Sequence, residues 1–327
     1  MSAPRPRAVA GGTVALLRYV GIRLGQAVIA LLGMVTAVFF ALRLSGDPAR
    51  LLAPQGATEA DIEQLRHTFG LDVPVWHQYT NFLVGLLHGN VGYSYVQRES
   101  ALLLIAQRMP YTAQLALVAL ILSVVLGVVA GMIMALNRGG WGDRVITPIV
   151  LAGQAMPAFW TGILLILVFS VSLHLLPSTG YDGPASLLLP AITLASLSAA
   201  TIARVTRGAV LEQLSRDYVR TARSKGASTF RLIWRHLLRN VSIPILTVCA
   251  LETANLLGGS VVTELIFAWP GVGQLTVQSV SDRDFPVVQA IVILASTVYI
   301  LINLVTDIAY GFIDPRVTAS VRGGGAT

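Results

Sequence analysis

The segment RDYVRTARSKGASTFRLIWRHLLRNVSIP, from Arg216 to Pro244, lies between two apolar runs that are each long enough to cross a bilayer. Its second half has a helical period, because apolar residues recur at i, i+3, i+4, i+7 and i+8: Phe230, Ile233, Trp234, Leu237 and Leu238. The pattern predicts a helix lying flat on the inner membrane surface. Its apolar side would face lipid and its arginines would face anionic headgroups.

The first half of this segment predicts a docking face for another protein. Ala222 and Gly226 lie four residues apart and are ringed by Arg220, Arg223 and Lys225. A spot with so little side chain lets a partner's groove approach the backbone closely. The alternative is a basic helix that only anchors to lipid, and such an anchor does not require the small pair.

The composition places the chain in a membrane. Of its 327 residues, 54% are hydrophobic and only 12% are charged, about half the charged share of soluble domains. The net charge of +7 comes from arginines concentrated in segments that are all cytoplasmic if the N-terminus is inside. This is the positive-inside bias, so the basic charge reports topology and no nucleic-acid partner is expected.

The order of the apolar runs predicts an all-α integral membrane protein with six spans. A cytoplasmic tail (1–16) precedes the first span (17–44), an extracytoplasmic lid (45–110) follows it, a membrane core occupies 111–313, and 314–327 form a second cytoplasmic tail. The five core spans are expected at about Thr112–Leu136, from Ile146 to Leu175, and at Ala191–Val210, Ile243–Phe267 and Val287–Tyr310.

The glycines and prolines of these spans predict how the helices pack and bend. Gly127 and Gly131 form a G-x-x-x-G pair that favours close helix packing. The third run is either one long tilted helix or two segments broken at Pro157, and a total of six spans favours the continuous helix. In the lid, helices are expected at Asp61–Thr68, which Gly70 ends, and at Pro74–Leu87.

The cationic segment resembles the EAA loop of ABC importer permeases, in the form of the dipeptide, oligopeptide and nickel branch. The matching positions run from Asp217 through Ala222 and Gly226 to Asn240 and Pro244. The general consensus has Glu where Arg220 stands and a late Leu-Pro that is absent here. Further stretches share the likeness: GLDVPVWHQYTNFLVGLLHGNVGYS in the lid, Trp269 to Gly273 followed by Arg283 to Pro286 before the last span, and Asp314 to Arg316.

The resemblance implies a type I importer permease fold, with a coupling helix at about 216–230 that sits in a cleft of an ATPase subunit. The residues implied in coupling are Arg220, Thr221, Ala222, Arg223, Lys225, Gly226 and Ala227. The implied partners are a second homologous permease, two ATP-binding subunits and an extracytoplasmic substrate-binding protein. The implied substrate is a short peptide, with a nickel chelate, haem or glutathione as alternatives, and the implied location is the bacterial cytoplasmic membrane.

The chain shows no catalytic or metal-binding pattern. Lys225, the only lysine, is followed by Gly226 and not preceded by a phosphate-loop sequence. ATP and Mg²⁺ are therefore expected on partner subunits, with no cofactor in this chain. Cys249 is the single cysteine, and the five histidines have no ligand spacing.

The acidic residues near the outer side admit several readings. Glu252 and Glu264 lie within a span, where an ionisable group usually faces a pathway or a partner. They could line a substrate path or outer gate, hydrogen-bond a neighbouring helix, or belong to a proton relay. Asp282, Arg283 and Asp284 are expected in an ordered outer loop with solvated charges. A gradient-driven transporter or channel remains the rival class.

Overall fold

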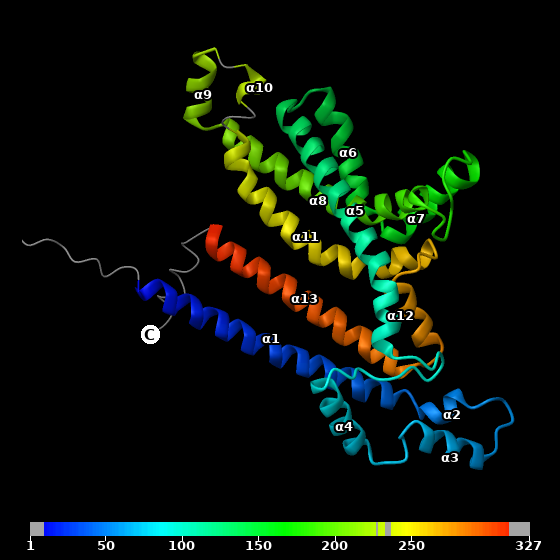
Figure 1. Ribbon diagram of the computed structural model, residues 1–327. Coiled ribbons are helices and arrows are strands. Elements are labelled where there is room, and N and C mark those ends of the chain that lie inside the picture. The colour runs from blue at the N-terminus through cyan, green and yellow to red at the C-terminus, as the bar shows by residue number, and fades with distance from the viewer. Residues whose placement is uncertain (1–9, 227, 233–236, 314–327) are drawn as a thin grey trace, which may run out of the picture. The chain divides into compact units, whose positions relative to one another are not determined.

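The computed structural model describes residues 10–226, 228–232 and 237–313. All of its regular elements in these ranges are helices, and the predicted all-helical class is confirmed (Figure 1). The fold divides into two compact units. The first comprises the chain up to Leu103 together with Ser279 onward, and the second is Leu104–Gln278.

Two long apolar helices form the membrane part of the first unit. α1 (Ala10–Leu44) and α13 (Phe285–Ile313) lie side by side (Figure 1). Both are long and apolar enough to cross a membrane, over Gly21–Leu44 and Phe285–Ile302. The structure therefore groups the last span with the first span and the lid.

The lid consists of three helices after α1: α2 (Pro48–Leu52), α3 (Glu59–Thr68) and α4 (Val75–Leu87). α3 begins at a capping box, in which the Thr58 hydroxyl accepts from the Asp61 amide and the Asp61 carboxylate accepts from the Thr58 amide. It ends before Gly70, whose φ is +64°. Both predicted lid helices are confirmed.

Aromatic side chains fasten the lid to α1. Phe39 stacks on Phe82 with ring centroids 5.7 Å apart, and Phe40 meets Trp76 edge-on at 5.4 Å. The Thr36 and Tyr79 hydroxyls share a 2.6 Å hydrogen bond. These contacts join α4 to the C-terminal end of α1.

The second unit is built around α8 (Leu188–Leu214), the most buried of the long helices. It packs against α6, α7 and α11. The other elements of the unit are α5 (Ala101–Leu136), α6 (Trp141–Ala155), α7 (Ala158–Leu165), η1 (Ile166–Ser172), η2 (Pro184–Leu187), α9 (Asp217–Ser224), α10 (Thr229–Leu232), α11 (Leu238–Ile266) and α12 (Val272–Ser281).

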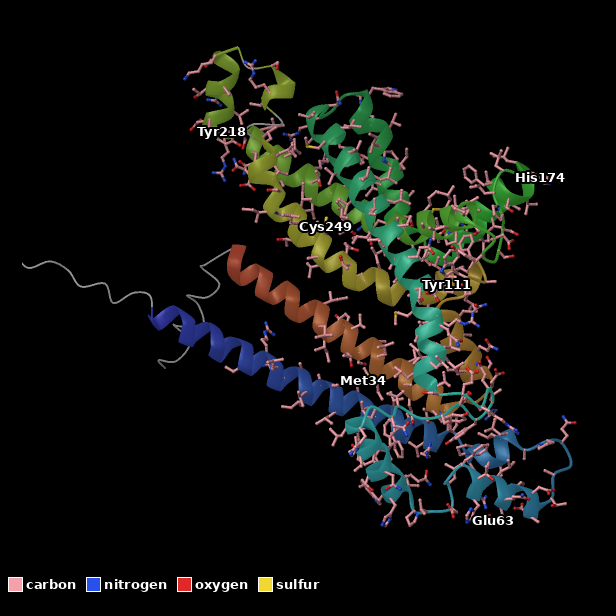
Figure 2. All side chains as sticks on the ribbon, in the orientation of Figure 1. Met34, Glu63, Tyr111, His174, Tyr218 and Cys249 are labelled. Atoms are coloured by element: carbon pink, nitrogen blue, oxygen red, sulfur yellow. The ribbon has the colours of Figure 1, made fainter. Side chains whose placement is uncertain are left out.

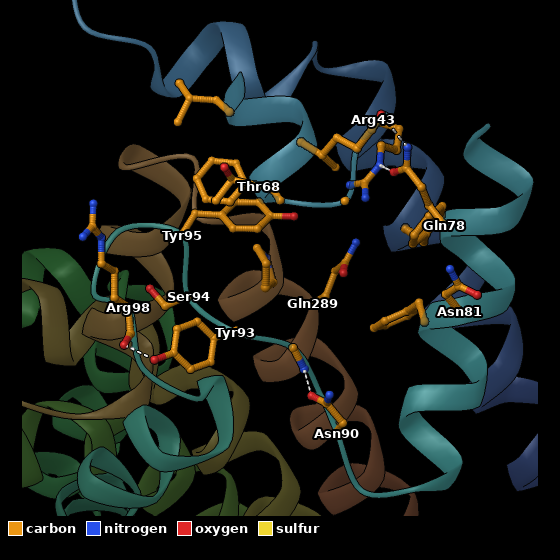
Figure 3. A pocket seen from close by; sticks show the side chains of 18 residues that line it. Arg43, Thr68, Gln78, Asn81, Asn90, Tyr93, Ser94, Tyr95, Arg98 and Gln289 are labelled. Atoms are coloured by element: carbon orange, nitrogen blue, oxygen red, sulfur yellow. Dashed lines mark hydrogen bonds between the residues drawn. The ribbon is translucent and has the colours of Figure 1, made fainter. Parts of the chain in front are cut away.

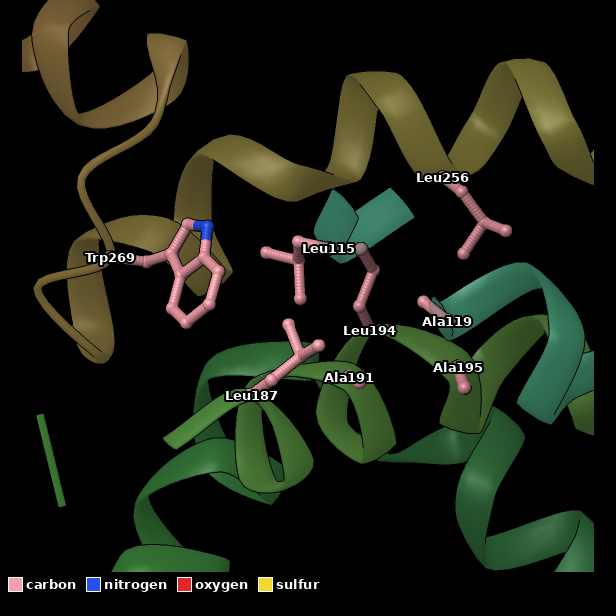
Figure 4. Close-up of a cluster of buried hydrophobic side chains, with 8 residues drawn as sticks. All are labelled: Leu115, Ala119, Leu187, Ala191, Leu194, Ala195, Leu256 and Trp269. Carbon is pink, nitrogen blue, oxygen red and sulfur yellow. The ribbon is translucent and has the colours of Figure 1, made fainter. Parts of the chain in front are cut away.

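One buried cluster of this unit combines small side chains with the large ring of Trp269. Trp269 is fully buried at one end of a cluster that also includes Leu115, Leu194 and Leu256 (Figure 4). The Trp269 indole nitrogen donates to the Tyr111 carbonyl at 3.0 Å. The indole thus buries its ring without leaving its N–H unpaired.

The G-x-x-x-G pair packs as predicted. A Cβ at Gly127 would lie 2.8 Å from the Ala199 carbonyl oxygen, and one at Gly131 would lie 2.5 Å from that of Ala203. Only glycine permits α5 to approach the α8 backbone so closely.

The expectation of one continuous third span is wrong. α6 and α7 are separate helices, and the direction of the chain bends by 114° between them. Met156 is extended, with φ −81° and ψ 129°, because the residue before a proline is disfavoured in helical geometry, and Pro157 then caps α7. Within the described ranges, four helices are long and apolar enough to span a membrane, and the number rises to six if each bent pair counts as one span.

Candidate functional site

α9 carries the predicted docking segment and has one buried side. Val219 is 1% exposed and packs with Leu232 and Leu237, while Ala222 lies half-buried against the same cluster. Tyr218, labelled in Figure 2, donates to the Gln213 side chain at 2.9 Å and accepts from Asn240 at 3.3 Å. These bonds hold α9 to the ends of α8 and α11.

The opposite side of α9 is exposed and cationic. Arg220, Thr221 and Lys225 are exposed, and the helix ends in a turn where Gly226 has a φ of +78°. A Cβ at Gly226 would meet nothing within 4 Å. The glycine is therefore required by backbone conformation, not by crowding within the chain.

Of the predicted small pair, Ala222 is half-buried against the cluster, whereas Gly226 is exposed in the turn after the helix. Ala227 and the side chain of Arg223 lie outside the described residues.

The predicted lipid-facing stripe is only partly described. α10 covers Thr229–Leu232, and Ile233 and Trp234 lie outside the described residues. Leu237 was expected to face lipid, but it is fully buried against Val219. At this position the apolar side chain covers α9 instead, since α9 offers the nearest apolar surface.

Glu264 is fully buried near the end of α11 and hydrogen-bonds neighbouring elements. Its carboxylate accepts from the Thr112 hydroxyl at 2.8 Å and from the Gln274 amide at 3.1 Å. The Thr112 oxygen in turn accepts from the Val272 amide at 2.8 Å. The carboxylate thus joins α5, α11 and the start of α12.

Two glycines make room for this carboxylate. A Cβ at Gly271 would collide with the Glu264 carboxylate and the Thr112 hydroxyl, and one at Gly273 would lie 2.8 Å from the carboxylate. Of the readings open from the sequence, the geometry matches a carboxylate that hydrogen-bonds neighbouring helices.

Glu252 is 7% exposed and accepts a 2.7 Å hydrogen bond from Ser198, which links α11 to α8. Like Glu264, Glu252 therefore has a hydrogen-bond partner on a neighbouring helix, as expected at a helix contact.

Among the described residues, no three His, Cys, Asp or Glu side chains gather as metal ligands would.

The expectation that the outer-loop charges stay solvated is wrong for Asp284. This residue is 1% exposed and accepts hydrogen bonds from the Ser94 hydroxyl and, at 3.0 Å, from the Tyr95 amide. Burial raises the pKa of its carboxyl, although these hydrogen bonds act in the opposite direction. Asp282 and Arg283 are exposed, as expected.

Sequence reasoning missed the partners of these acids. Thr112, Ser94 and Ser198 are ordinary hydroxyl residues, and the first two lie more than 150 residues from the acid each one contacts. One usable signal was present: Gly271 and Gly273 follow the acid closely, a spacing that indicates close approach to the backbone.

The comparisons with known proteins agree with this architecture. The family described as "Binding-protein-dependent transport system inner membrane component" matches residues 127–319, and its N-terminal counterpart matches residues 16–116. The chain is 42% identical over 295 residues to the "Glutathione transport system permease protein GsiC" of Escherichia coli strain K12, covering 88% of this chain and 96% of the relative. GsiC of Shigella dysenteriae serotype 1 matches with the same figures.

The fold also resembles a solved transporter. The MetNI methionine ABC transporter in an inward-facing conformation aligns with a TM-score of 0.54 at 20% identity, over 67% of this chain and 96% of that one. Together these findings define a membrane permease component of an ABC importer. The chain belongs to the binding-protein-dependent transport system inner membrane component family, in its dipeptide, oligopeptide and nickel branch.

Proposed function

We propose that this chain is one permease half of an ATP-driven importer that carries short peptides, glutathione among them, across the bacterial cytoplasmic membrane. A second homologous permease completes the pathway, two ATP-binding subunits supply the energy, and an extracytoplasmic binding protein delivers the substrate. Membership of a binding-protein-dependent transport family supports this assembly.

The observation that carries the proposal is the exposed turn at the end of α9. Arg220, Lys225 and Gly226 are exposed there, while Val219 anchors the helix from its other side. A short helix fixed on one face and open on the other transmits force to the helices that hold it. ATP and Mg²⁺ act on the partner subunits, because the only lysine of this chain is not part of a phosphate loop.

The proposed orientation places both termini in the cytoplasm. The arginines of the α9 segment and of the tails then lie inside, in agreement with the positive-inside bias. The lid helices lie outside, where a binding protein can reach them.

The proposed substrate class rests on the relatives. GsiC is named for glutathione transport, and glutathione is itself a three-residue peptide with a free carboxylate at each end. Other di- and tripeptides are similar to glutathione in size and in their charged ends, so we propose a small-peptide importer with glutathione as the first candidate.

A transport assay tests the proposal. The chain is reconstituted in proteoliposomes with its second permease and ATPase subunits, with the binding protein added outside, and uptake of labelled glutathione is followed with and without internal ATP. Di-, tri- and longer peptides, nickel and haem serve as competitors.

ATP-dependent uptake that small peptides compete for supports the proposal. Uptake that needs an ion gradient and no ATPase subunit refutes it in favour of a secondary transporter. Competition by nickel or haem alone refutes the peptide assignment and keeps the importer.

A further inference from the structure

The first unit contains a cavity of about 800 Å³. Its walls come from α1, the end of α3, α4, the loop after α4 and the start of α13 (Figure 3). Ligand pockets for small molecules typically have volumes of about 300–1,000 Å³. The cavity therefore has room for a molecule of short-peptide size.

Two buried donors in this cavity have no hydrogen-bond partner among the described residues. They are Nη1 of Arg43, on α1, and Nε2 of Gln289, on α13. Gln289 is 6% exposed, and leaving such a buried donor unpaired is costly. Figure 3 shows the two side chains pointing toward one another across the cavity, from opposite walls.

Arg43 is held in place by its other contacts. Its Nε donates to the Gln78 side chain at 3.0 Å, and its guanidinium lies 4.7 Å from the centroid of the Phe39 ring. Gln78 is itself fixed, since its Nε2 donates to the Val73 carbonyl at 2.8 Å. The free Nη1 is thus pre-oriented, which lowers the entropy lost when a ligand binds.

Tyr95 adds a third donor to the same space. Its ring stacks on Phe69 with centroids 4.3 Å apart, and its amide is bonded to Asp284. Figure 3 shows its hydroxyl directed toward the space between Arg43 and Gln289. Burial raises the pKa of this phenol, so it remains a neutral donor.

The charge of the lining favours an anion. Its charged side chains are Arg43 and Arg98, and none of the described residues that line the cavity is Asp or Glu. The nearby Asp47 is paired with Arg66 at 2.6 Å. Figure 3 shows the Arg98 guanidinium directed away from the other donors. One cation and two neutral donors suit a carboxylate with one negative charge better than a phosphate.

We propose that this cavity binds one carboxylate group of a short peptide, with Arg43, Gln289 and Tyr95 as its donors. The aromatic walls at Phe39, Phe69 and Phe82 accommodate the apolar part of the molecule. That the carboxylate belongs to a peptide rests on the proposed function. That the cavity binds a carboxylate rests on the donor geometry alone.

Equilibrium binding of labelled trialanine tests the site. The full chain is used with its partner subunits in phosphatidylcholine nanodiscs, without ATP and without the binding protein. The C-terminal amide of trialanine is the matched probe, because it lacks only the carboxylate charge. We expect the amide to bind at least about tenfold more weakly, as loss of a charge-assisted bond predicts.

Three variants locate the binding in this cavity. Arg43→Gln removes the cation and Gln289→Glu adds a competing carboxylate, and each is expected to weaken trialanine binding about tenfold or more. Tyr95→Phe keeps the stacked ring, so it should fold normally and weaken binding about threefold to tenfold. Arg50→Gln is the control, because Arg50 is exposed, pairs with Glu59 and does not line the cavity.

Equal affinity for trialanine and its amide overturns the proposal. The proposal is also overturned if Tyr95→Phe binds trialanine as tightly as the wild type and so does Arg43→Gln or Gln289→Glu, provided that this second variant keeps the wild-type melting temperature. Inorganic phosphate that displaces the peptide better than acetate shows a phosphate site and overturns the carboxylate assignment. Normal peptide uptake with no binding at this cavity would refute the site alone, whereas site binding without ATP-driven uptake would refute the proposed function alone.

Discussion

The hydroxyl of Thr112, on α5, donates a 2.8 Å hydrogen bond to the carboxylate of Glu264, 152 residues later on α11. Both side chains are buried, at 7% and 0% exposure. Because the same Thr112 oxygen accepts from the Val272 amide, one side chain connects the entry of α12 to two long helices.

Replacing Thr112 by valine should destabilise the second unit without removing the charge of Glu264. The valine keeps the shape and removes both hydrogen bonds, so the expected loss is about 1–3 kcal/mol. Thermal unfolding in nanodiscs measures it. The control is Thr201→Val, because the Thr201 hydroxyl bonds to the Leu197 carbonyl of its own helix and has no second partner among the described residues. If Thr112→Val keeps its stability but changes the apparent KM for peptide, Glu264 belongs to the substrate path.

A side chain at Gly131 should separate α5 from α8. In Gly131→Leu the new Cβ would stand 2.5 Å from the Ala203 oxygen and 2.6 Å from the Thr206 Cβ. Such overpacking typically destabilises by about 1–3 kcal/mol. The yield of monodisperse protein and its melting temperature report the effect. Gly33→Leu on α1 is the matched change, since nothing lies within 4 Å of its Cβ, and equal losses in both variants would contradict the contact.

Asp284 should make the first unit more stable in mild acid. Its pKa is raised by burial above the ordinary value of 3.8, so the folded state favours the protonated carboxyl. The raised pKa therefore stabilises the folded state fully at pH values below the ordinary pKa. This stabilisation is lost as the pH rises through the raised pKa.

The comparison of wild type with Asp284→Asn isolates this group from the other acids. The asparagine does not titrate, so the difference in unfolding free energy between the two proteins should change as the pH rises above 3.8. Melting curves between about pH 4 and 7 measure it. A constant difference across that range would show that the carboxyl is not perturbed.

A bulky residue at Gly226 should abolish uptake and leave the protein inserted. Leucine would be strained at a φ of +78° and would cover the open turn that we propose meets the ATPase. Gly139→Leu separates the two effects, since Gly139 has a similar φ of +74°, also has open space around it, and lies in the turn between α5 and α6. Uptake in proteoliposomes and ATPase activity are the readouts. Equal loss of uptake in both variants would indicate strain alone.

Much of this fold was predictable from the sequence because its signals are local. Long apolar runs predict spans, the glycine at 70 predicts the end of α3, and the spacing of Gly127 and Gly131 predicts a close helix contact. Each of these depends on residues that are neighbours along one helix.

What the sequence did not predict depends on residues far apart in the chain. The sequence predicts a solvated Asp284, but in the structure its carboxylate is buried and accepts hydrogen bonds from Ser94 and Tyr95. The sequence predicts that Leu237 faces lipid, but in the structure it packs in a buried cluster with Val219. The break at Pro157 was foreseen as a possibility, but hydropathy alone cannot separate a bent pair from a tilted helix, since both have the same composition.

The bond between Ser94 and Asp284 joins residues 190 positions apart within the first unit. Since a ribosome makes the chain from its N-terminus, the segment around Ser94 must wait for almost the whole remaining polypeptide before its acceptor arrives. Premature stop codons ahead of α13 should therefore yield an exposed, unfinished lid that membrane quality-control proteases recognise, even when every earlier span has entered the bilayer.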